Sequence, residues 1–283
     1  MEWERRLGGG GYLASVPFQV RYDDTTPSAY RLFLIWNPLY PTVLIYCRDS
    51  YREGVIRLGE TTYRIAVIDE DTDGRYDDLS GGTLLIDLDQ DGDLLTTMDS
   101  HERYMLDEPF NVNGTVYRVT TVAPDGSHIE IEVTDEWVAA KPPLEVGYPA
   151  PLFDGIDTNG REISLSSVRG SIVLLDFWAS WCAPCIWELP TLKELAAEFA
   201  DNGLVVLGIN LDRSEGAFDQ AIIEHVLTYP QIYDGIEGPI ASLYRIAGIP
   251  MTYLIDRKGI IHGKGLRGED LRQAIETLLS DSP

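Results

Sequence analysis

Cysteine, histidine and basic residues are scarce in this chain. It has only three cysteines and four histidines among 283 residues, and 22 Lys and Arg against 46 Asp and Glu. Three cysteines cannot build a disulfide framework, so the close pair Cys182 and Cys185 indicates catalytic or metal-binding chemistry instead. The formal net charge of −24 repels phosphate backbones and anionic lipid headgroups. We therefore expect no nucleic-acid partner.

Long hydrophobic runs are also missing. No stretch of 18 or more apolar residues occurs, so the sequence predicts no membrane-spanning helix. The first residues, Met1 to Leu7 followed by four glycines, lack the apolar segment of a signal peptide. Two explanations remain open at this point: the protein is cytosolic, or a targeting segment was removed before this form of the chain.

The first half of the chain contains short β-type runs separated by turn residues. The expected strands are Phe18–Tyr22, Tyr30–Trp36, Thr42–Cys47, Thr62–Ile68, Leu84–Leu88, Val116–Val122 and Ile129–Val133. Short strands at this spacing favour an antiparallel sandwich or barrel. Pro142 and Pro143 then end the pattern. We place a domain boundary there, with a mostly β domain at residues 1–141 and a second domain at residues 142–283.

The second half alternates strands with helices. Strands are expected at Ser171–Trp178, Leu204–Asn210 and Met251–Asp256, and helices at Cys182–Ala200, Ala217–Leu227 and Glu269–Leu279. This order predicts an α/β domain with a parallel or mixed sheet and helices on both faces.

Cys182 and Cys185 follow an apolar strand and open a helix. The first amides of the helix and the positive end of its dipole should lower the pKa of the Cys182 thiol, which makes Cys182 the expected nucleophile. Cys185 lies one helical turn away and can resolve a mixed disulfide. Half of a zinc site is the alternative, but the sequence has neither a second Cys pair nor paired histidines at ligand spacing. We therefore favour a redox-active pair that needs no cofactor for the redox step.

The residues around this pair resemble a known family. Leu174–Cys185 (LLDFWASWCAPC) is similar to the active-site strand and helix start of thioredoxins. Ile186–Pro190, Val146–Pro151 and Gly248–Asp256 are similar to the TlpA/ResA-like branch of thiol-disulfide oxidoreductases. The resemblance covers about residues 144–281. It implies a thioredoxin fold, and a periplasmic or membrane-anchored reductant of the kind used for cytochrome c maturation and related disulfide reduction.

The resemblance also assigns roles to two carboxylates. Asp176 stands six residues before Cys182, where thioredoxins carry a buried carboxylate, although the TlpA/ResA-like branch often has Asn there. A desolvated carboxylate has a raised pKa and could accept a proton from Cys185. Glu188 matches a carboxylate that this branch uses near its site. The alternative is that Asp176 is a structural polar group and Glu188 an exposed helix residue.

Three further residues are expected to contact substrate. Pro250 stands where thioredoxin folds carry a cis-proline that faces the cysteines, so a cis Ile249–Pro250 bond would present the backbone of Ile249 to a substrate peptide. Trp181 is the expected aromatic cover of the site, although tryptophan is more often a core residue.

Two aspartate-rich loops in the first half both read Asp-x-Asp-x-Asp-Gly. Alternating aspartates before a glycine can surround one hard cation with oxygen ligands, and calcium is the natural candidate. The twelfth position holds Ser80 or Met98 instead of the usual glutamate. The predicted ligands, with Asp77 and Asp93 as auxiliaries, are Asp69, Asp71, Asp73, Asp77, Asp87, Asp89, Asp91 and Asp93. A solvated acidic face is the alternative. The loops also resemble those of extracytoplasmic bacterial β-domains.

We therefore predict a protein disulfide reductase that acts outside the cytoplasm, with a disulfide-bearing protein substrate and a membrane-bound thiol donor. Its targeting segment would be absent from this chain. A peroxiredoxin-like peroxidase is one alternative, but Leu175 and Ala179 stand where a peroxidatic site has Pro and Thr. A calcium-dependent binding protein with a secondary redox domain is another.

Overall fold

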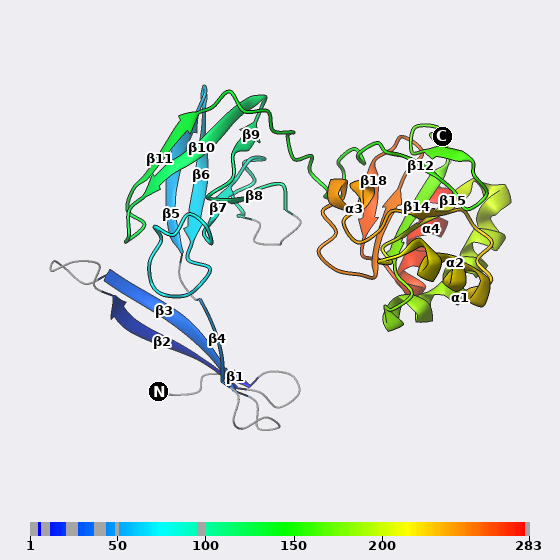
Figure 1. The fold of residues 1–283 in the computed structure, drawn as a ribbon, viewed down its shortest axis with the longest axis horizontal. Helices are drawn as coiled ribbons and strands as arrows, with labels where there is room; N and C mark the ends of the chain where they lie inside the picture. The colour runs from blue at the N-terminus through cyan, green and yellow to red at the C-terminus, as the bar shows by residue number, and fades with distance from the viewer. Residues whose placement is uncertain are drawn as a thin grey trace. The chain divides into compact units, whose positions relative to one another are not determined.

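The structure is a computed structural model that divides into two compact units, Met1–Lys141 and Pro142–Pro283. It describes residues 51–94 and 100–280, together with the backbone of four strands within the first 50 residues. Each unit is described by itself below (Figure 1).

In the described part of the N-terminal unit, the strands form three antiparallel sheets. The first has the order β1-β2-β3-β4, with strands Arg5–Arg6, Tyr12–Val20, Ser28–Trp36 and Leu44–Arg48. The second has the order β5-β6-β7-β8, with strands Arg52–Leu58, Thr61–Ile68, Thr83–Ile86 and Arg103–Met105. The third has the order β11-β10-β9, with strands Ile129–Val133, Thr115–Val122 and Phe110–Val112.

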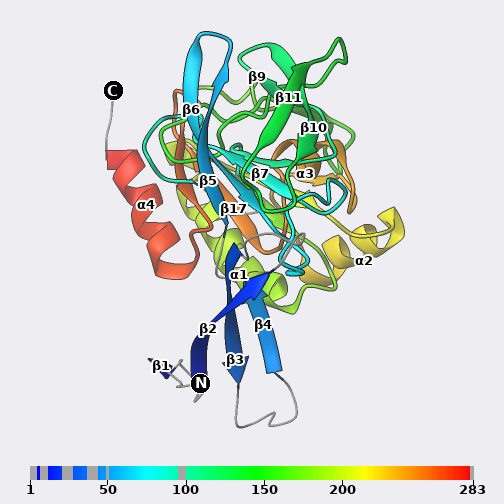
Figure 2. The same ribbon diagram turned by 90° about the vertical axis from the view of Figure 1, so that its left-hand side faces the viewer.

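One hydrophobic core joins the second and third sheets. Ile65 and Ile86 of the second sheet cluster with Phe110 and Val119 of the third. Two sheets that share one core in this way form a sandwich. The β5–β6 hairpin, visible in Figures 1 and 2, turns at Gly59, whose φ of +60° favours glycine.

The predicted β-rich class of the first half is confirmed. The short strands β8 and β9 and the polar strand β5 were not predicted. β5 carries mostly exposed or half-buried side chains at the edge of its sheet, so it lacks the apolar signal of a buried strand.

The C-terminal unit has a five-stranded sheet with the order β16-β15-β14-β17-β18. These strands are Gln231–Tyr233, Leu204–Asn210, Ile172–Trp178, Met251–Ile255 and Ile261–Lys264. β14 pairs in parallel with β15 and antiparallel with β17, so the sheet is mixed, as predicted. A separate hairpin joins β12 (Asp154–Ile156) to β13 (Glu162–Ser164).

Helices cover both faces of this sheet. The helices are α1 (Ala183–Phe199), α2 (Glu215–His225), α3 (Pro239–Leu243) and α4 (Gly268–Ser280), with a 3-10 turn at Ala200–Asn202. Leu195 of α1 and Ile275 of α4 pack with Leu174 of β14 on one face. Ile240 of α3 packs with Leu175 of β14 on the other. None of the described helices combines the length and hydrophobicity needed to cross a membrane.

Strand β14 is buried along its whole length because both of its faces are covered. Its side chains alternate between the two faces, so Asp176 points to the same side as Leu174, toward α1 and α4. The chain leaves β14 at Trp178 and begins α1 a few residues later. This strand-to-helix connection carries the two cysteines.

Candidate functional site

The start of α1 holds the two cysteines together. Cys182 is the N-cap residue, and its Sγ accepts a hydrogen bond from the backbone N–H of Cys185 at 3.3 Å. The two residues form a disulfide, with an S–S distance of 2.10 Å and a Cα–Cα distance of 5.3 Å. The free amides at a helix start favour negative charge, so a reduced Cys182 would be stabilised as a thiolate.

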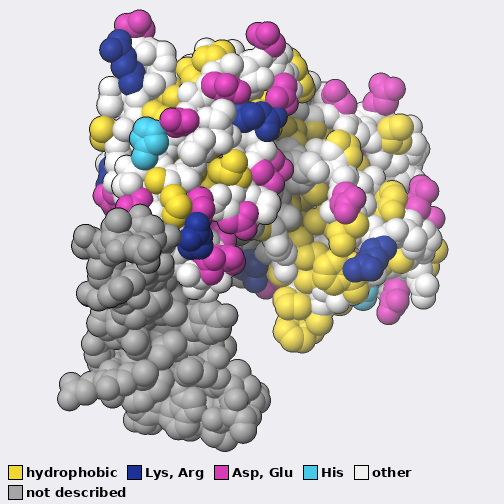
Figure 3. Space-filling model, turned by 60° about the vertical axis from the view of Figure 1, so that its left-hand side comes forward, with side chains coloured by type: hydrophobic (Ala, Val, Ile, Leu, Met, Phe, Trp, Pro, Cys, Tyr) yellow, Lys and Arg dark blue, Asp and Glu magenta, His cyan; other side chains and the backbone are white. Residues whose placement is uncertain are grey.

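The disulfide is buried among apolar side chains but lies beside exposed aromatic ones. Cys182 is 5% exposed and Cys185 is 2% exposed, in a cluster that includes Leu189 and Phe218. Trp181, immediately before Cys182, is 58% exposed, so it is not a core residue. Figure 3 shows hydrophobic side chains gathered on the visible face of the C-terminal unit. A tryptophan next to a nearly buried disulfide is available to contact a docked polypeptide.

The turn before the cysteines is fixed by a buried acid that sequence reasoning missed. Asp212 is fully buried, and its carboxylate accepts hydrogen bonds from the Ser180 hydroxyl at 2.8 Å and the Asn210 amide at 2.9 Å. Ser180 follows β14 and Asp212 follows β15. Because parallel strands place their carboxyl ends at one edge of a sheet, the strand pairing was the signal that could have identified this contact.

Asp176 lies in the core of the C-terminal unit, on β14. It is 3% exposed, and its Oδ2 has no hydrogen-bond partner among residues 51–94 and 100–280. Burial, followed by the negative charge of Glu188, raises the pKa of Asp176 to about 7, against a smaller opposing effect of Arg267. The carboxyl group can therefore exchange a proton near neutral pH.

Two charged residues at the edge of the core, Glu188 and Arg267, act on the Asp176 carboxylate through their charges. Glu188 lies on α1 and is half-buried rather than fully exposed. Arg267 is exposed just before α4, and its Nη2 donates a hydrogen bond to the Pro250 carbonyl at 2.5 Å. Burial and the Asp176 charge also raise the pKa of Tyr229. Neither Arg267 nor Tyr229 was identified from the sequence, because both contacts depend on chain segments far from the Cys motif.

The expected cis-proline is present. The Ile249–Pro250 peptide bond is cis, and Pro250 is buried. The half-buried Ile249 packs against the cluster that contains Cys182 and Cys185. The structure therefore brings Ile249 close to the disulfide, where its backbone can meet an extended substrate peptide.

The two positions that a peroxidatic site would need carry hydrocarbon side chains. Leu175 and Ala179 are both fully buried. Leu175 belongs to the core of the sheet, and Ala179 packs with the cysteines. No hydroxyl group is available at either position.

The first aspartate loop follows β6 and brings Asp69, Asp71 and Asp73 together. One oxygen from each lies within 4.8 Å of the others. The buried Asp69 accepts the N–H of Thr72 at 2.8 Å on Oδ1 and that of Gly74 at 2.9 Å on Oδ2. Asp77, a predicted auxiliary ligand, instead forms an ion pair with Arg75 at 2.7 Å.

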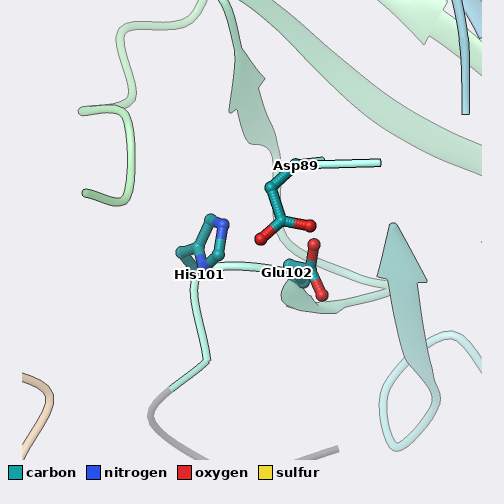
Figure 4. A group of neighbouring side chains, drawn as sticks. All are labelled: Asp89, His101 and Glu102. Carbon is teal, nitrogen blue, oxygen red and sulfur yellow. The ribbon is translucent and has the colours of Figure 1, made fainter. Parts of the chain in front are cut away.

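The second aspartate loop follows β7 and has different neighbouring side chains. Oxygens of Asp87, Asp89 and Asp91 lie within 4.8 Å of one another. Asp89 also forms a second group with His101 and Glu102, whose side chains face it in Figure 4. Asp93 is exposed and belongs to neither group. His101 and Glu102 were not identified from the sequence, and Met98 lies outside the described residues.

The C-terminal unit is similar to known redox proteins. The model of the AhpC/TSA family matches residues 146–264. Thiol-disulfide oxidoreductase ResA of Oceanobacillus iheyensis is 39% identical over 120 residues, which cover 41% of this chain and 62% of the relative. The ResA of Geobacillus thermodenitrificans is 32% identical over 142 residues, 49% of this chain and 80% of the relative.

Among solved structures, this chain is similar to the thioredoxin domain of a thiol-disulfide oxidoreductase from Bacteroides vulgatus. The two are 34% identical, and the match covers 48% of this chain and 99% of that one, with a TM-score of 0.46. The first ResA match spans less than two thirds of that relative's length, and the second spans about four fifths.

Proposed function

Because the chain belongs to the family of thiol-disulfide oxidoreductase ResA, we propose that Cys182 and Cys185 reduce disulfide bonds in other proteins. The disulfide between them at the start of α1 is the observation that carries this proposal. The pair exchanges two electrons by sulfur chemistry alone, so the redox step needs no cofactor.

In the proposed reaction, the reduced Cys182 thiolate attacks one sulfur of the substrate disulfide. The substrate S–S bond breaks, its second sulfur leaves as a thiolate, and a mixed disulfide with Cys182 forms. Cys185 then attacks Sγ of Cys182, the mixed disulfide breaks, and the substrate sulfur that was bonded to Cys182 leaves as a thiolate. The enzyme disulfide has formed, and both released sulfurs take up protons. Two electrons have passed from the enzyme dithiol to the substrate.

The proposed proton acceptor for Cys185 is Asp176. A pKa of about 7 leaves a substantial fraction of this carboxyl group ionised at neutral pH, yet basic enough to accept a thiol proton. Glu188 contributes by raising that pKa through its charge. The position of Asp176 on the face that α1 covers supports this role.

We propose that Trp181, Ile249 and Pro250 bind the substrate polypeptide. Trp181 offers an exposed aromatic surface, and Ile249 packs against the cluster that contains the two cysteines. An extended peptide could pair with this backbone while one of its cysteines approaches Cys182.

We also propose that the protein works outside the cytoplasm and is re-reduced by a membrane-bound thiol donor. Protein disulfides persist in oxidising compartments, so that is where a protein disulfide reductase finds substrate. Each turnover leaves Cys182 and Cys185 oxidised, so a second dithiol must restore them. Cell fractionation followed by thiol alkylation would test both points: a protein found only in the cytosol would contradict the proposal.

Turnover of a model protein disulfide with a dithiol donor tests the reductase function. Replacing Cys182 by Ser should lower the rate by about a thousandfold or more, because it removes the nucleophile. Replacing Cys185 by Ser should instead accumulate a mixed disulfide on Cys182. Cys47→Ser, in β4, is the matched control and should keep full activity. An unchanged rate for Cys182→Ser would refute the proposal.

For the N-terminal unit we propose calcium binding at the two aspartate triplets, Asp69, Asp71 and Asp73, and Asp87, Asp89 and Asp91. The oxygen spacing within each triplet suits a cation with oxygen ligands at 2.3–2.6 Å, the range that calcium prefers. Calorimetry of the full chain with calcium and with a chelator tests it: identical unfolding traces would leave both loops as a solvated acidic face.

A further inference from the structure

Pairing between β7 and β8 brings two distant chain segments together beside the second aspartate loop. Leu85 pairs with Arg103, and the N–H of Ile86 donates to the Glu102 carbonyl at 2.9 Å. The same antiparallel register places Asp87, where the chain leaves β7, opposite the residues that precede β8. The loop therefore has a second wall, formed by His101 and Glu102.

Asp87 is a buried carboxylate with one oxygen that accepts no hydrogen bond from the described residues. It is only 5% exposed, and no residue in the described ranges 51–94 and 100–280 donates a hydrogen bond to its Oδ1. The guanidinium of Arg64 donates hydrogen bonds to the Gly92 carbonyl and, at 2.8 Å, to Glu53. Glu53 first, and then the charge of Asp87, raises the pKa of Arg64, so Arg64 interacts with Asp87 through its charge but donates no hydrogen bond to Oδ1. A buried ionised carboxylate is destabilising unless a positive charge offsets it, so this position favours a bound cation.

Glu102 supplies a second buried carboxylate to the same place. It is fully buried, and its Oε1 accepts the N–H of Leu88 at 2.8 Å, which orients the carboxylate toward the loop. Oxygens of Glu102 and Asp89 lie within 4.8 Å of each other, beside the imidazole of His101 (Figure 4). Asp89 thus belongs both to the loop triplet and to the second wall.

We infer that Asp87, Asp89, Asp91 and Glu102 bind one calcium ion, with Glu102 as the closing ligand that the loop itself lacks. The inference deepens the calcium proposal above and rests on it. Four carboxylates offer the six to eight oxygen contacts that calcium takes. We do not expect His101 to bind the calcium ion, because imidazole nitrogen is a ligand for transition metals rather than for calcium. The ion would link the residues that follow β7 to the residue that precedes β8.

Among residues 51–94 and 100–280, no second group of metal-ligating side chains is found beside the first loop. Both carboxylate oxygens of its buried aspartate, Asp69, accept backbone N–H groups of the same loop. Its predicted auxiliary, Asp77, is paired with Arg75. The second loop should therefore bind calcium more tightly, and Asp71 of the first loop provides a matched control.

Hydrogen exchange of the full chain tests the inference, with peptides covering residues 87–103 compared in 1 mM calcium and in chelator. Calcium should slow exchange in these peptides by about tenfold or more, since binding at ten times the dissociation constant already contributes that factor. Asp87→Asn and Glu102→Gln should abolish the effect, whereas Asp71→Asn should keep it. Unchanged exchange in β10 peptides would show that each variant is folded.

Each outcome has a distinct meaning. Protection that survives Glu102→Gln would overturn the inference while leaving calcium binding by the loop in place. No calcium effect in any peptide of the N-terminal unit would overturn both proposals. Protection by zinc or manganese but not by calcium would overturn it in favour of a site built on His101. If the variants do not fold, the carboxyl ¹³C shift of Glu102 in the unmodified chain decides: it should move on calcium addition, and a constant shift would refute the inference.

Discussion

Each unit contains one buried aspartate with a carboxylate oxygen that lacks a hydrogen-bond partner within residues 51–94 and 100–280: Asp87 in the N-terminal unit and Asp176 in the C-terminal unit. Their surroundings differ. Asp176 lies in an apolar core, where Glu188 and Arg267 act on it through their charges, whereas Asp87 lies beside the carboxylates of Asp89 and Asp91. The comparison shows that burial alone does not determine how such a charge is neutralised.

The number of neighbouring carboxylates explains why we expect a proton on one buried aspartate and a metal ion at the other. A single carboxylate in an apolar core is neutralised by one proton, which is why burial raises the pKa of Asp176. Several carboxylates around one point would each need a proton, but a single divalent cation compensates two charges and supplies coordination to all of them. We therefore expect Asp176 to exchange protons and Asp87 to hold a metal ion.

The largest expected effect comes from replacing each of the two aspartates in turn and measuring both disulfide reduction and calcium binding. Asp176→Asn should slow resolution of the mixed disulfide by Cys185 by about a hundredfold at pH 7, the usual scale for loss of a general base. Attack by Cys182 should change less. Rapid mixing of the reduced enzyme with a substrate disulfide separates the two steps.

Asp87→Asn serves as the reciprocal control for this experiment. It should leave both reductase steps unchanged and remove the calcium response, while Asp176→Asn should keep the calcium response. If Asp176→Asn left both steps with their normal rates and pH profiles, Asp176 would be a structural residue, and the contrast with Asp87 would fail.

The pH dependence of the free energy of unfolding tests, without a catalytic assay, whether Asp176 carries a proton in the folded state. The folded state keeps a proton on Asp176 up to a pKa of about 7, whereas the unfolded chain releases it near its ordinary value of 3.8. Stability from this group is therefore complete below about pH 4 and is lost as the pH rises to about 7. At 1.36 kcal/mol per pH unit, the loss between pH 5 and pH 7 is about 2–3 kcal/mol.

Urea unfolding of the oxidised chain, followed by tryptophan fluorescence, checks this expectation. Asp176→Asn should be more stable than the unmodified chain, and its advantage should grow by that amount between pH 5 and pH 7. Glu188→Gln should retain most of the pH dependence, because burial is the main cause of the shift. Identical pH dependence in the Asn variant would place the titrating group elsewhere.

The sequence predicted the C-terminal unit well because its elements carry strong local signals. The run Ile172–Trp178 is apolar except for Asp176, as expected for a strand covered on both faces, and the resemblance to TlpA/ResA-like proteins added the cis bond before Pro250. The α/β prediction, the family and the cis bond are confirmed. The short elements β16, β18 and α3 were missed, because each has only three to five residues.

Contacts between distant segments were not identified from the sequence, although the predicted pairing of two parallel strands could have indicated the first of them. Asp212 reaches Ser180 through the pairing of β14 with β15, and Glu102 reaches Asp89 through the pairing of β7 with β8. Because β8 has only three residues and no clear alternation, the second wall of the aspartate loop had no signal. The roles assigned to Asp176 and Glu188, and the eight aspartate ligands, stay predictions.

The smallest expected effect concerns the charges around Asp176. Glu188 raises the pKa of Asp176 and Arg267 lowers it, but both influences are weaker than that of burial. Glu188→Gln should therefore lower this pKa, and Arg267→Gln should raise it, each by less than about one pH unit, because water screens charges at the edge of the core.

Titration of the Asp176 carboxyl ¹³C resonance in the oxidised chain measures the pKa directly, without interference from the thiols. Glu194→Gln, on the same helix, is the matched control and should leave it unchanged. A fall to the ordinary range in Glu188→Gln would mean that a neighbouring charge, not burial, sets the pKa of Asp176. Asp176 would then resemble Asp87 in depending on its acidic neighbours, and the distinction between a single buried carboxylate and a cluster would no longer hold.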